Sequence, residues 1–298
     1  MEYKKPPLSF EEQANQLLHR GLVSDRDELI VRLKAVNYYR LSGYLYTYRN
    51  ADDTYRKGTT LHEVWRRYTF DRRLRMHMLD AIERIEVAVR TRLAYVFSHK
   101  FGPFGHLESK NLPCFSKDQY EKWRLALADE FKRSRETFVQ HFRDKYGDSH
   151  EALPLWMAVE LMAFGTMLRM YGGVDAHIQA EVSAAFGFPD RVFHSWLMAI
   201  NGVRNICAHH QRLWNRALGL KPLIPRKRKY PGWHEPVSMT NSRIFSIITI
   251  SKHLISKIDP ESCWARRFVA LLDKYPEIPK TQMGMPDNWC ESPLWRDV

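Results

Sequence analysis

One short segment of the chain brings together side chains that could act on a phosphodiester bond. Arg204, Asn205 and His209 lie within six residues, and on a helix Asn205 and His209 share one face because they are four residues apart. An imidazole titrates near neutral pH, so it can take a proton from a ribose 2′-hydroxyl or give one to the leaving oxygen. A guanidinium can hold the phosphate through two hydrogen bonds and stabilise the transition state. This chemistry needs no metal ion; a merely solvated polar helix face is the alternative interpretation.

The helix that must carry this segment is expected to begin at Pro189 and to continue to about residue 218. Arg212 would then share the polar face with His209, while His210 would lie at the edge of the buried stripe. This geometry favours His209 as the acting histidine, with His210 as the alternative. The buried stripe itself is expected to comprise Trp196, Ile200, Val203, Cys207 and Trp214.

The angular positions of the candidate groups favour a two-fold assembly. Arg204 and His209 lie about 140° apart on an ideal helix, so one copy does not obviously converge on a single phosphate. Two antiparallel copies across a dimer axis would bring each polar face against its twin. A homodimer with a composite site is therefore expected.

Two further segments carry charged residues that could support this site. Glu86 and Arg90 are an i,i+4 pair, which is either an ordinary helix salt bridge or a pair that reaches the cleft and orients Arg204. Glu160 lies within the apolar run LWMAVELMAF. A buried carboxylate there would need a partner such as Arg204, whereas a solvent-facing one would not.

A basic loop is the second candidate for contact with a nucleic acid. Single-stranded RNA binds cationic side chains through its backbone and stacks its bases on aromatic rings. An exposed linker would show the same composition. The residues expected to contact RNA are Arg226, Lys227, Arg228, Lys229 and Tyr230, with Trp233 close behind.

The overall charge fits these candidates but does not select them. The 298 residues include 46 Lys and Arg against 34 Asp and Glu, a net charge of +12 that could serve RNA binding, an anionic membrane surface or solubility. No segment is apolar and long enough for a transmembrane helix, and the N-terminus lacks a secretory signal. The four cysteines are far apart and form no CxxC pair, which favours the cytoplasm. No metal-ligand, P-loop or dinucleotide motif occurs, so neither a metal nor a cofactor is expected.

Helical periodicity runs through nearly the whole chain and predicts an all-α fold. Ser9 and Glu12 form a capping box before the first helix. Three segments are expected: an N-terminal helical module with a Tyr-rich signature (1–58), a helical core (59–220), and a basic loop with two helices and a strap (221–298). Helices are expected at about 9–20, 25–36, 117–145, 154–171, 175–186, 189–218, 241–257 and 260–275, and the helical segment 60–99 is expected as two helices or one bent helix.

The segment RNICAHH, residues 204–210, resembles the R-x4-6-H motif of HEPN-domain ribonucleases. An ordered set of segments resembles the Abi-like, abortive-infection family (AbiD/AbiF type) over nearly the whole chain. These segments are PLSFEEQANQLLHRGL (7–22), NYYRLSGYLYTYR (37–49), IERIEVAVRTRLAYVFSH (82–99), LPLWMAVELMAFGTMLRMY (153–171), RNICAHHQRLWNR (204–216) and MGMPDNW (283–289).

This resemblance implies a HEPN-like helical bundle, a dimeric composite site and metal-independent RNA cleavage in phage defence or a toxin–antitoxin pair. It implies catalytic roles for Arg204 and His209 with Asn205 in support, and it leaves His210 open because R-x5-H also fits. RNA is then the substrate, and a structured non-coding RNA is a candidate antitoxin. Two other functions remain: a non-catalytic RNA-binding defence protein, and a protein-interaction module that senses infection.

Overall fold

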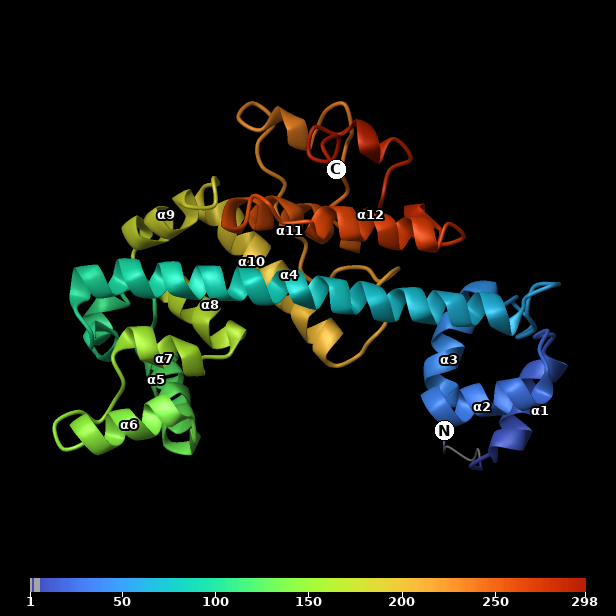
Figure 1. The fold of residues 1–298 in the computed structure, drawn as a ribbon, viewed down its shortest axis with the longest axis horizontal. Coiled ribbons are helices and arrows are strands. Elements are labelled where there is room, and N and C mark those ends of the chain that lie inside the picture. Colours follow the sequence, from blue (N-terminus) through green and yellow to red (C-terminus); the bar gives the residue numbers. More distant parts are fainter. Residues whose placement is uncertain (1, 3–5) are drawn as a thin grey trace. The chain divides into compact units, whose positions relative to one another are not determined.

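The computed structural model describes Glu2 and residues 6–298, which form twelve α-helices (Figure 1). Two isolated bridges are the only β-type pairings within this described part, so the all-α prediction is confirmed. The helices are Phe10–His19 (α1), Arg26–Val36 (α2), Tyr38–Leu45 (α3), Leu61–Phe101 (α4), Lys117–Arg133 (α5), Thr137–Tyr146 (α6), Leu155–Leu161 (α7), Phe164–Gly173 (α8), Ala176–Ala184 (α9), Asp190–Ala208 (α10), Ile244–Ile258 (α11) and Trp264–Lys274 (α12).

The chain divides into two compact units. The first comprises Met1–Met76 and Val269–Ile278, and the second comprises His77–Phe268 and Pro279–Val298. Helices α4 and α12 therefore contribute residues to both units. The expected segment boundaries after residues 58 and 220 fall just before α4 and in the loop between α10 and α11. The three-segment organisation and the HEPN-like arrangement stay predictions.

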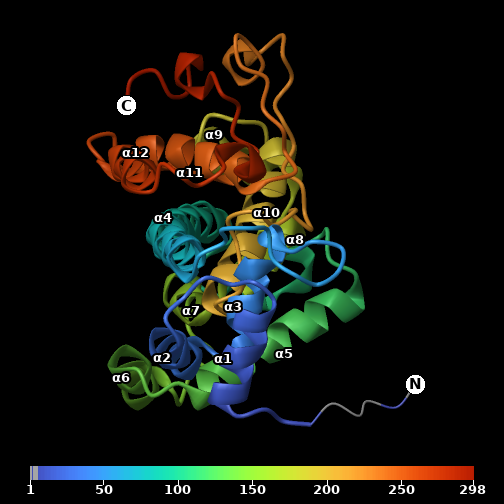
Figure 2. The same cartoon turned by 90° about the vertical axis from the view of Figure 1, so that its right-hand side faces the viewer.

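In the first unit, α2 packs against both α1 and α3 (Figures 1 and 2). The predicted capping box starts α1: the Glu12 amide donates to Ser9 Oγ at 3.2 Å, and the Ser9 amide donates to Glu12 Oε2 at 2.7 Å. Both bonds satisfy amides that have no partner inside the helix. The helices then bury apolar side chains, among them Leu17, Leu29 and Leu33.

A buried charged group also lies in the first unit. Asp71 is fully buried and accepts hydrogen bonds from the Tyr44 hydroxyl at 2.6 Å and from Arg75 Nη1 at 2.5 Å. Burial and the neighbouring Asp71 carboxylate raise the pKa of Tyr44. Because a buried ion would be costly without partners, this group joins α3 firmly to α4.

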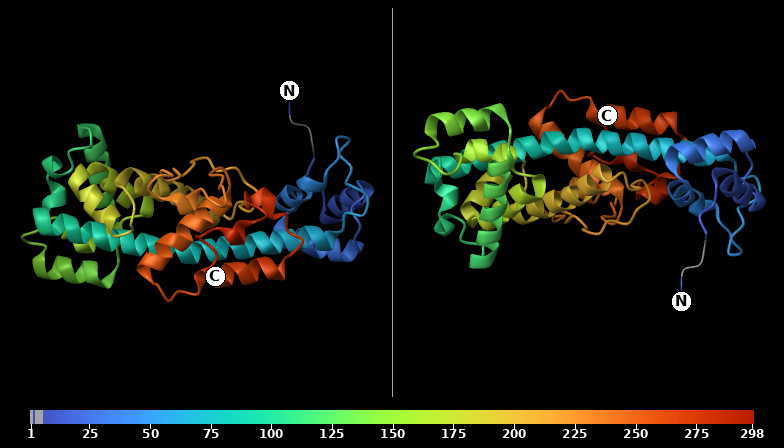
Figure 3. Two further views of the ribbon diagram at one scale, coloured as in Figure 1. Left: turned by 90° about the horizontal axis from the view of Figure 1, so that it is seen from above. Right: turned by 90° about the horizontal axis from the view of Figure 1, so that it is seen from below.

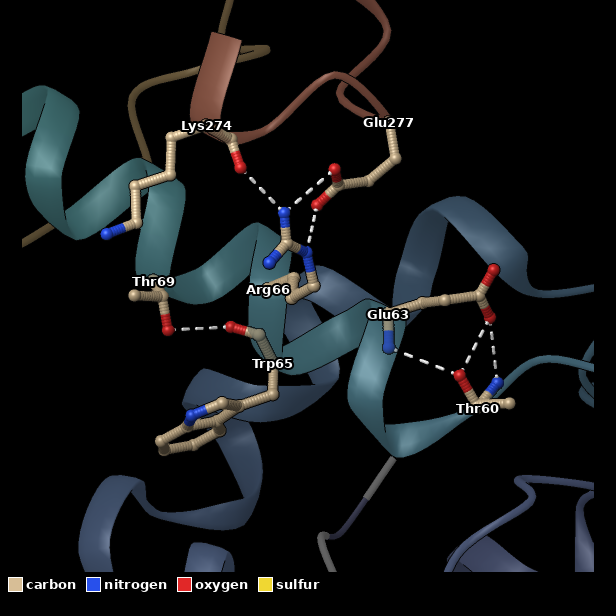
Figure 4. A network of polar contacts seen from close by, with 7 residues as sticks. All are labelled: Thr60, Glu63, Trp65, Arg66, Thr69, Lys274 and Glu277. Carbon is tan, nitrogen blue, oxygen red and sulfur yellow. Dashed lines mark hydrogen bonds and ion pairs between the residues drawn. The ribbon is translucent and has the colours of Figure 1, made fainter. Parts of the chain in front are cut away.

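The start of α4 is held by a second set of polar contacts in the same unit (Figure 4). Thr60 and Glu63 cap the helix reciprocally, since the Glu63 amide donates to Thr60 Oγ1 at 3.2 Å and the Thr60 amide donates to Glu63 Oε2 at 3.0 Å. One turn later, Arg66 donates to the Lys274 carbonyl at 2.8 Å and to the Glu277 carboxylate at 2.5 and 3.1 Å. The guanidinium thus fixes α4 to the end of α12.

In the second unit, α10 packs against α8, α9 and α11, and α5 packs against α7 and α8 (Figures 1 and 3). Four of the five residues expected in the buried stripe of α10 are confirmed, because Trp196, Ile200, Val203 and Cys207 are all buried. Trp214 is also buried, but it lies beyond the end of α10 and so is not part of this helix face. This stripe faces the helices of the core. The polar side of α10 is therefore the side that can meet a ligand.

Two predicted helices are each interrupted by a short extended segment. The segment expected at 117–145 forms α5 and α6, because the chain leaves the helix between residues 134 and 136. The segment expected at 154–171 forms α7 and α8, separated by Met162 and Ala163, whose ψ angles are 128° and 152°. Apolar periodicity continues across both interruptions, so periodicity alone does not reveal them. The second interruption shapes the candidate site.

Acid is expected to destabilise the second unit through buried His106. Its side chain is fully buried, and burial lowers its pKa to about 4. In the unfolded chain this imidazole would take up a proton near its ordinary pKa of 6.5, whereas in the folded chain it stays neutral down to about pH 4. The folded state therefore has its full stability above pH 6.5 and loses stability as the pH falls toward 4. At pH 5 the expected loss is about 2 kcal/mol of unfolding free energy, measurable by urea titration at several pH values.

The matched variants for this measurement are His106→Leu and, on the exposed surface of α9, His177→Leu. His106→Leu should reduce the dependence of stability on pH between 7 and 5, and the remaining slope is expected from His77, whose pKa burial also lowers to about 4. His177→Leu should leave the dependence as in the wild type. Equal slopes in all three proteins would show that His106 does not carry the effect.

Candidate active site at the end of helix α10

Helix α10 begins directly after Pro189, as expected, but ends at Ala208 rather than near residue 218. His210 adopts a left-handed conformation with φ 54°. The Gln211 amide donates to the Ile206 carbonyl at 2.9 Å, and the His210 amide donates to the Cys207 carbonyl at 3.0 Å. These two bonds define a Schellman motif, which terminates a helix. Glycine usually occupies this left-handed position, and the segment AHHQ contains no glycine, so the sequence does not predict that the helix ends here.

This helix end corrects the expected placement of three residues. His209 is the C-cap of α10 and is exposed, and Arg212 lies beyond the helix rather than on its polar face. His210 is also exposed, so it does not point toward the buried stripe. The structural reason for preferring His209 over His210 was therefore wrong. The assignment of either histidine stays a prediction.

Arg204 and Asn205 do come together, in a surface pocket of about 340 Å³. The pocket lies where the polar side of α10 meets the first turn of α8. Its lining residues, all in the second unit, are Ala163, Phe164, Gly165, Thr166, Arg169, Asn201, Arg204 and Asn205. Of the described residues that line it, two carry positive charge and none carries negative charge. His209 is not among them; its amide donates to the Asn205 carbonyl at 3.0 Å, one helical turn farther along.

The Arg204 guanidinium is half-buried, and within residues 6–298 no hydrogen bond or ion pair engages it. Glu86 on α4 acts on it electrostatically. Burial raises the pKa of Glu86 above its ordinary value, and the positive charges of Arg90 and Arg204 counteract that rise. Arg204 therefore keeps its N–H donors available while a nearby carboxylate balances part of its charge.

Glu86 and Arg90 form the predicted pair, with Arg90 Nη2 donating to Glu86 Oε1 at 2.7 Å. The same nitrogen also donates to the Met162 carbonyl at 3.0 Å. Met162 begins the interruption between α7 and α8, directly before the pocket residue Ala163. The pair is thus more than a salt bridge within α4, because Arg90 also fixes the backbone next to the pocket rim.

Glu160 takes the solvent-facing alternative. Its side chain is 56% exposed, and its carboxylate lies 3.5 Å from Arg90 Nη1 rather than beside Arg204. At that distance and exposure the ion pair contributes little to stability. Glu160 therefore belongs to the periphery of the site.

The basic loop keeps its charges on the surface, since the side chains of residues 226–229 are all exposed. Lys227 forms an ion pair with Glu235. The aromatic residues that follow are engaged in packing: Tyr230 stacks on Phe188 with ring centroids 4.5 Å apart, and Trp233 is buried against Trp196 at 5.0 Å. The loop thus offers charge to a backbone, while its aromatic rings already have partners.

Three pocket residues on α8 were not predicted from the sequence as site residues. Gly165, Thr166 and Arg169 lie in the run AFGTMLRMY, which has the composition of a buried helix. The signal that could have drawn attention to them is a lone arginine within this apolar run. Asn201, one turn before Asn205 on α10, was missed as well.

Across the described chain no group of three or more His, Cys, Asp or Glu side chains is arranged to hold a metal ion. None of the described helices is both long and apolar enough to span a membrane.

The model of the family described as Abi-like protein matches residues 32–215, which is more than half of the chain. The matched region includes α4, the pocket and the end of α10. Searches of curated proteins and of solved structures returned no significant match.

Proposed function

The chain belongs to the Abi-like protein family, and from this membership we propose that it is a phage-defence ribonuclease that cleaves RNA without a metal ion. The family indicates a role in abortive infection. The ribonuclease activity rests on the R-x4-H segment, residues 204–209, and on the pocket beside it. The observation that carries the proposal is the half-buried Arg204, which lines a positively charged pocket five residues before an exposed histidine.

In the proposed reaction, the chain's residues act directly on the RNA backbone. His209 accepts the proton of a ribose 2′-hydroxyl, whose oxygen attacks the adjacent phosphorus. The P–O bond to the 5′-oxygen of the next nucleotide breaks, and that oxygen takes a proton from an imidazolium. Arg204 binds the phosphate oxygens and stabilises their added negative charge, with Asn205 in support.

A homodimer is part of this proposal. His209 does not line the pocket that holds Arg204 and Asn205, so one chain does not gather all three groups around one cavity. A two-fold interface across the exposed end of α10 would bring the His209 of a second copy toward the pocket. One histidine could then act as base and its twin as acid.

Sequencing the RNA that co-purifies with the protein tests this function. The wild type and His209→Ala are purified from cells in which growth inhibition is also measured. The ribonuclease proposal expects toxicity and cleaved RNA with the wild type, and intact bound RNA without toxicity for the variant. Intact RNA with both proteins would instead favour a non-catalytic RNA-binding protein, a function that the exposed loop 226–229 also suits. A structured RNA that co-purifies with the protein would be the candidate antitoxin. Absence of RNA would favour a protein-interaction module.

Chelation should leave cleavage intact. In 10 mM EDTA the rate is expected to stay within about twofold of that in magnesium, because imidazole and guanidinium groups supply the proton transfer and charge stabilisation. The measurement is a single-turnover cleavage assay at matched ionic strength, since salt alone weakens RNA binding. Loss of activity that zinc, manganese or magnesium restores would point to a metal-dependent reaction and overturn the proposal.

A further inference from the structure

The pocket between α8 and α10 has the chemistry of a nucleotide-binding site. We propose that it binds one nucleotide unit of single-stranded RNA, with its phosphate held between Arg169 and Arg204. Asn201 and Asn205 would contact polar atoms of the sugar or base. The inference rests on the proposed function for the identity of the polymer, but the recognition of a nucleoside phosphate rests on the pocket itself.

The two arginines have most of their donors available for an anion. Arg169 makes a single hydrogen bond within the described chain, from Nη2 to Thr166 Oγ1 at 3.2 Å. Arg204 makes none there, and a guanidinium carries five N–H donors. Because no carboxylate is among the described lining residues, a phosphate would meet positive charge from both helices.

The dimensions of the pocket suit a single nucleotide. Its volume of about 340 Å³ lies at the lower end of the range of roughly 300–1,000 Å³ found for small-molecule sites. Gly165 forms part of the wall: a Cβ atom built there would meet only Asn201 Nδ2, at 3.6 Å. A methyl group therefore fits, whereas a branched side chain would extend into the cavity. The amides of Asn201 and Asn205 can each donate and accept, as nucleobase edges and ribose hydroxyls require.

The position of the pocket would also set the register of the RNA. Asn205 lies one helical turn from His209, so a nucleotide bound beside Asn205 would place a neighbouring phosphodiester near the end of α10. Arg204, whose five N–H donors can contact two neighbouring phosphates, would then bridge the phosphate in the pocket and the scissile phosphodiester. Arg169 would bind only the phosphate in the pocket and would not touch the bond that breaks. Its removal should raise KM and leave kcat nearly unchanged.

The test measures binding with the full-length protein in EDTA. A fluorescein-labelled single-stranded RNA octamer is bound, and uridine 3′-monophosphate, uridine or inorganic phosphate is added as competitor. Arg169→Gln should weaken binding of the octamer and of the monophosphate by about tenfold or more, because a charged hydrogen-bonding group is lost. Arg191→Gln is the matched control, since Arg191 is an exposed arginine at the start of α10 outside the pocket. It should change affinity less than twofold.

A steric pair of variants tests the cavity independently of charge. Gly165→Ala should retain binding, and Gly165→Leu should abolish competition by the monophosphate, with unchanged melting temperature as the check on folding. If Arg169→Gln matches Arg191→Gln, or if Gly165→Leu binds the monophosphate like the wild type, the pocket assignment is overturned. Tighter binding of the free monophosphate than of the octamer would assign the pocket to free nucleotides and overturn the assignment to RNA.

The outcomes separate this inference from the proposed function. If RNA is cleaved and Arg169→Gln and Gly165→Leu cleave it with unchanged KM, the ribonuclease proposal stands and the nucleotide pocket fails. If no cleavage is found but the monophosphate binds in competition with the octamer and responds to both variants, the pocket stands and the catalytic proposal fails.

Discussion

Replacing His209 by alanine is expected to lower the single-turnover rate of RNA cleavage by about 10²–10⁴-fold, the usual contribution of a general acid or base. His209 caps an exposed helix end, and its imidazole is engaged by no hydrogen bond in the described part of the chain. Its removal should therefore alter the chemistry and not the fold, with a change in unfolding free energy within about 0.5 kcal/mol. The measurements are the cleavage rate at saturating protein and the urea unfolding midpoint.

His210→Gly is the matched control for this variant. Glycine keeps the left-handed backbone that ends α10, whereas alanine at φ 54° would be strained and would confuse two effects. The variant should retain cleavage within about tenfold of the wild type. A large loss with His210→Gly, together with an active His209→Ala, would transfer the catalytic role to His210.

Replacing Arg204 by alanine is expected to lower the cleavage rate by about 10²–10³-fold, as removal of a donor to a developing oxyanion does elsewhere. Arg204→Lys should recover only part of this loss. A lysine keeps the charge, but it lacks the planar fork that binds two phosphate oxygens at once. The rate constants of the three proteins, measured at saturating RNA, separate the contribution of charge from that of geometry.

The control for Arg204 is Arg212→Ala, since Arg212 was expected on the same helix face and lies instead beyond the helix end. The Arg212→Ala substitution should weaken the binding of RNA, but it should lower the cleavage rate at saturating RNA much less. Full activity of Arg204→Lys would show that charge alone suffices. Full activity of Arg204→Ala would remove Arg204 from the mechanism, and the R-x4-H interpretation with it.

Much of the fold could be predicted from local sequence signals. Ser9 and Glu12 mark the start of α1, Pro189 precedes α10, and the spacing of Trp196, Ile200 and Val203 identifies the buried face of α10. Each of these signals acts through neighbouring residues, as caps and helical periodicity do. The all-α class followed directly from them.

The features that shape the candidate site depend on contacts between distant segments. The interruption after α7 is stabilised by Arg90, which donates to the Met162 carbonyl from 72 residues away. The pocket then needs α8 to meet α10, which brings Arg169 and Arg204 to the lining of one pocket. The end of α10 depends on a histidine in a conformation that glycine normally adopts. The sequence therefore identified Arg204, Asn205 and His209 as candidates, but not the pocket or the geometry around them.

The chemical ends of the cleaved RNA test the central claim most directly. The wild type is incubated in EDTA with a defined single-stranded RNA, and the products are analysed by mass spectrometry. Attack by the 2′-hydroxyl predicts a 2′,3′-cyclic phosphate on the upstream fragment and a 5′-hydroxyl on the downstream fragment, with no product when the RNA is replaced by 2′-deoxy oligonucleotide. A 3′-hydroxyl and a 5′-phosphate, or cleavage of the deoxy substrate, would contradict acid–base catalysis by His209 with charge stabilisation by Arg204.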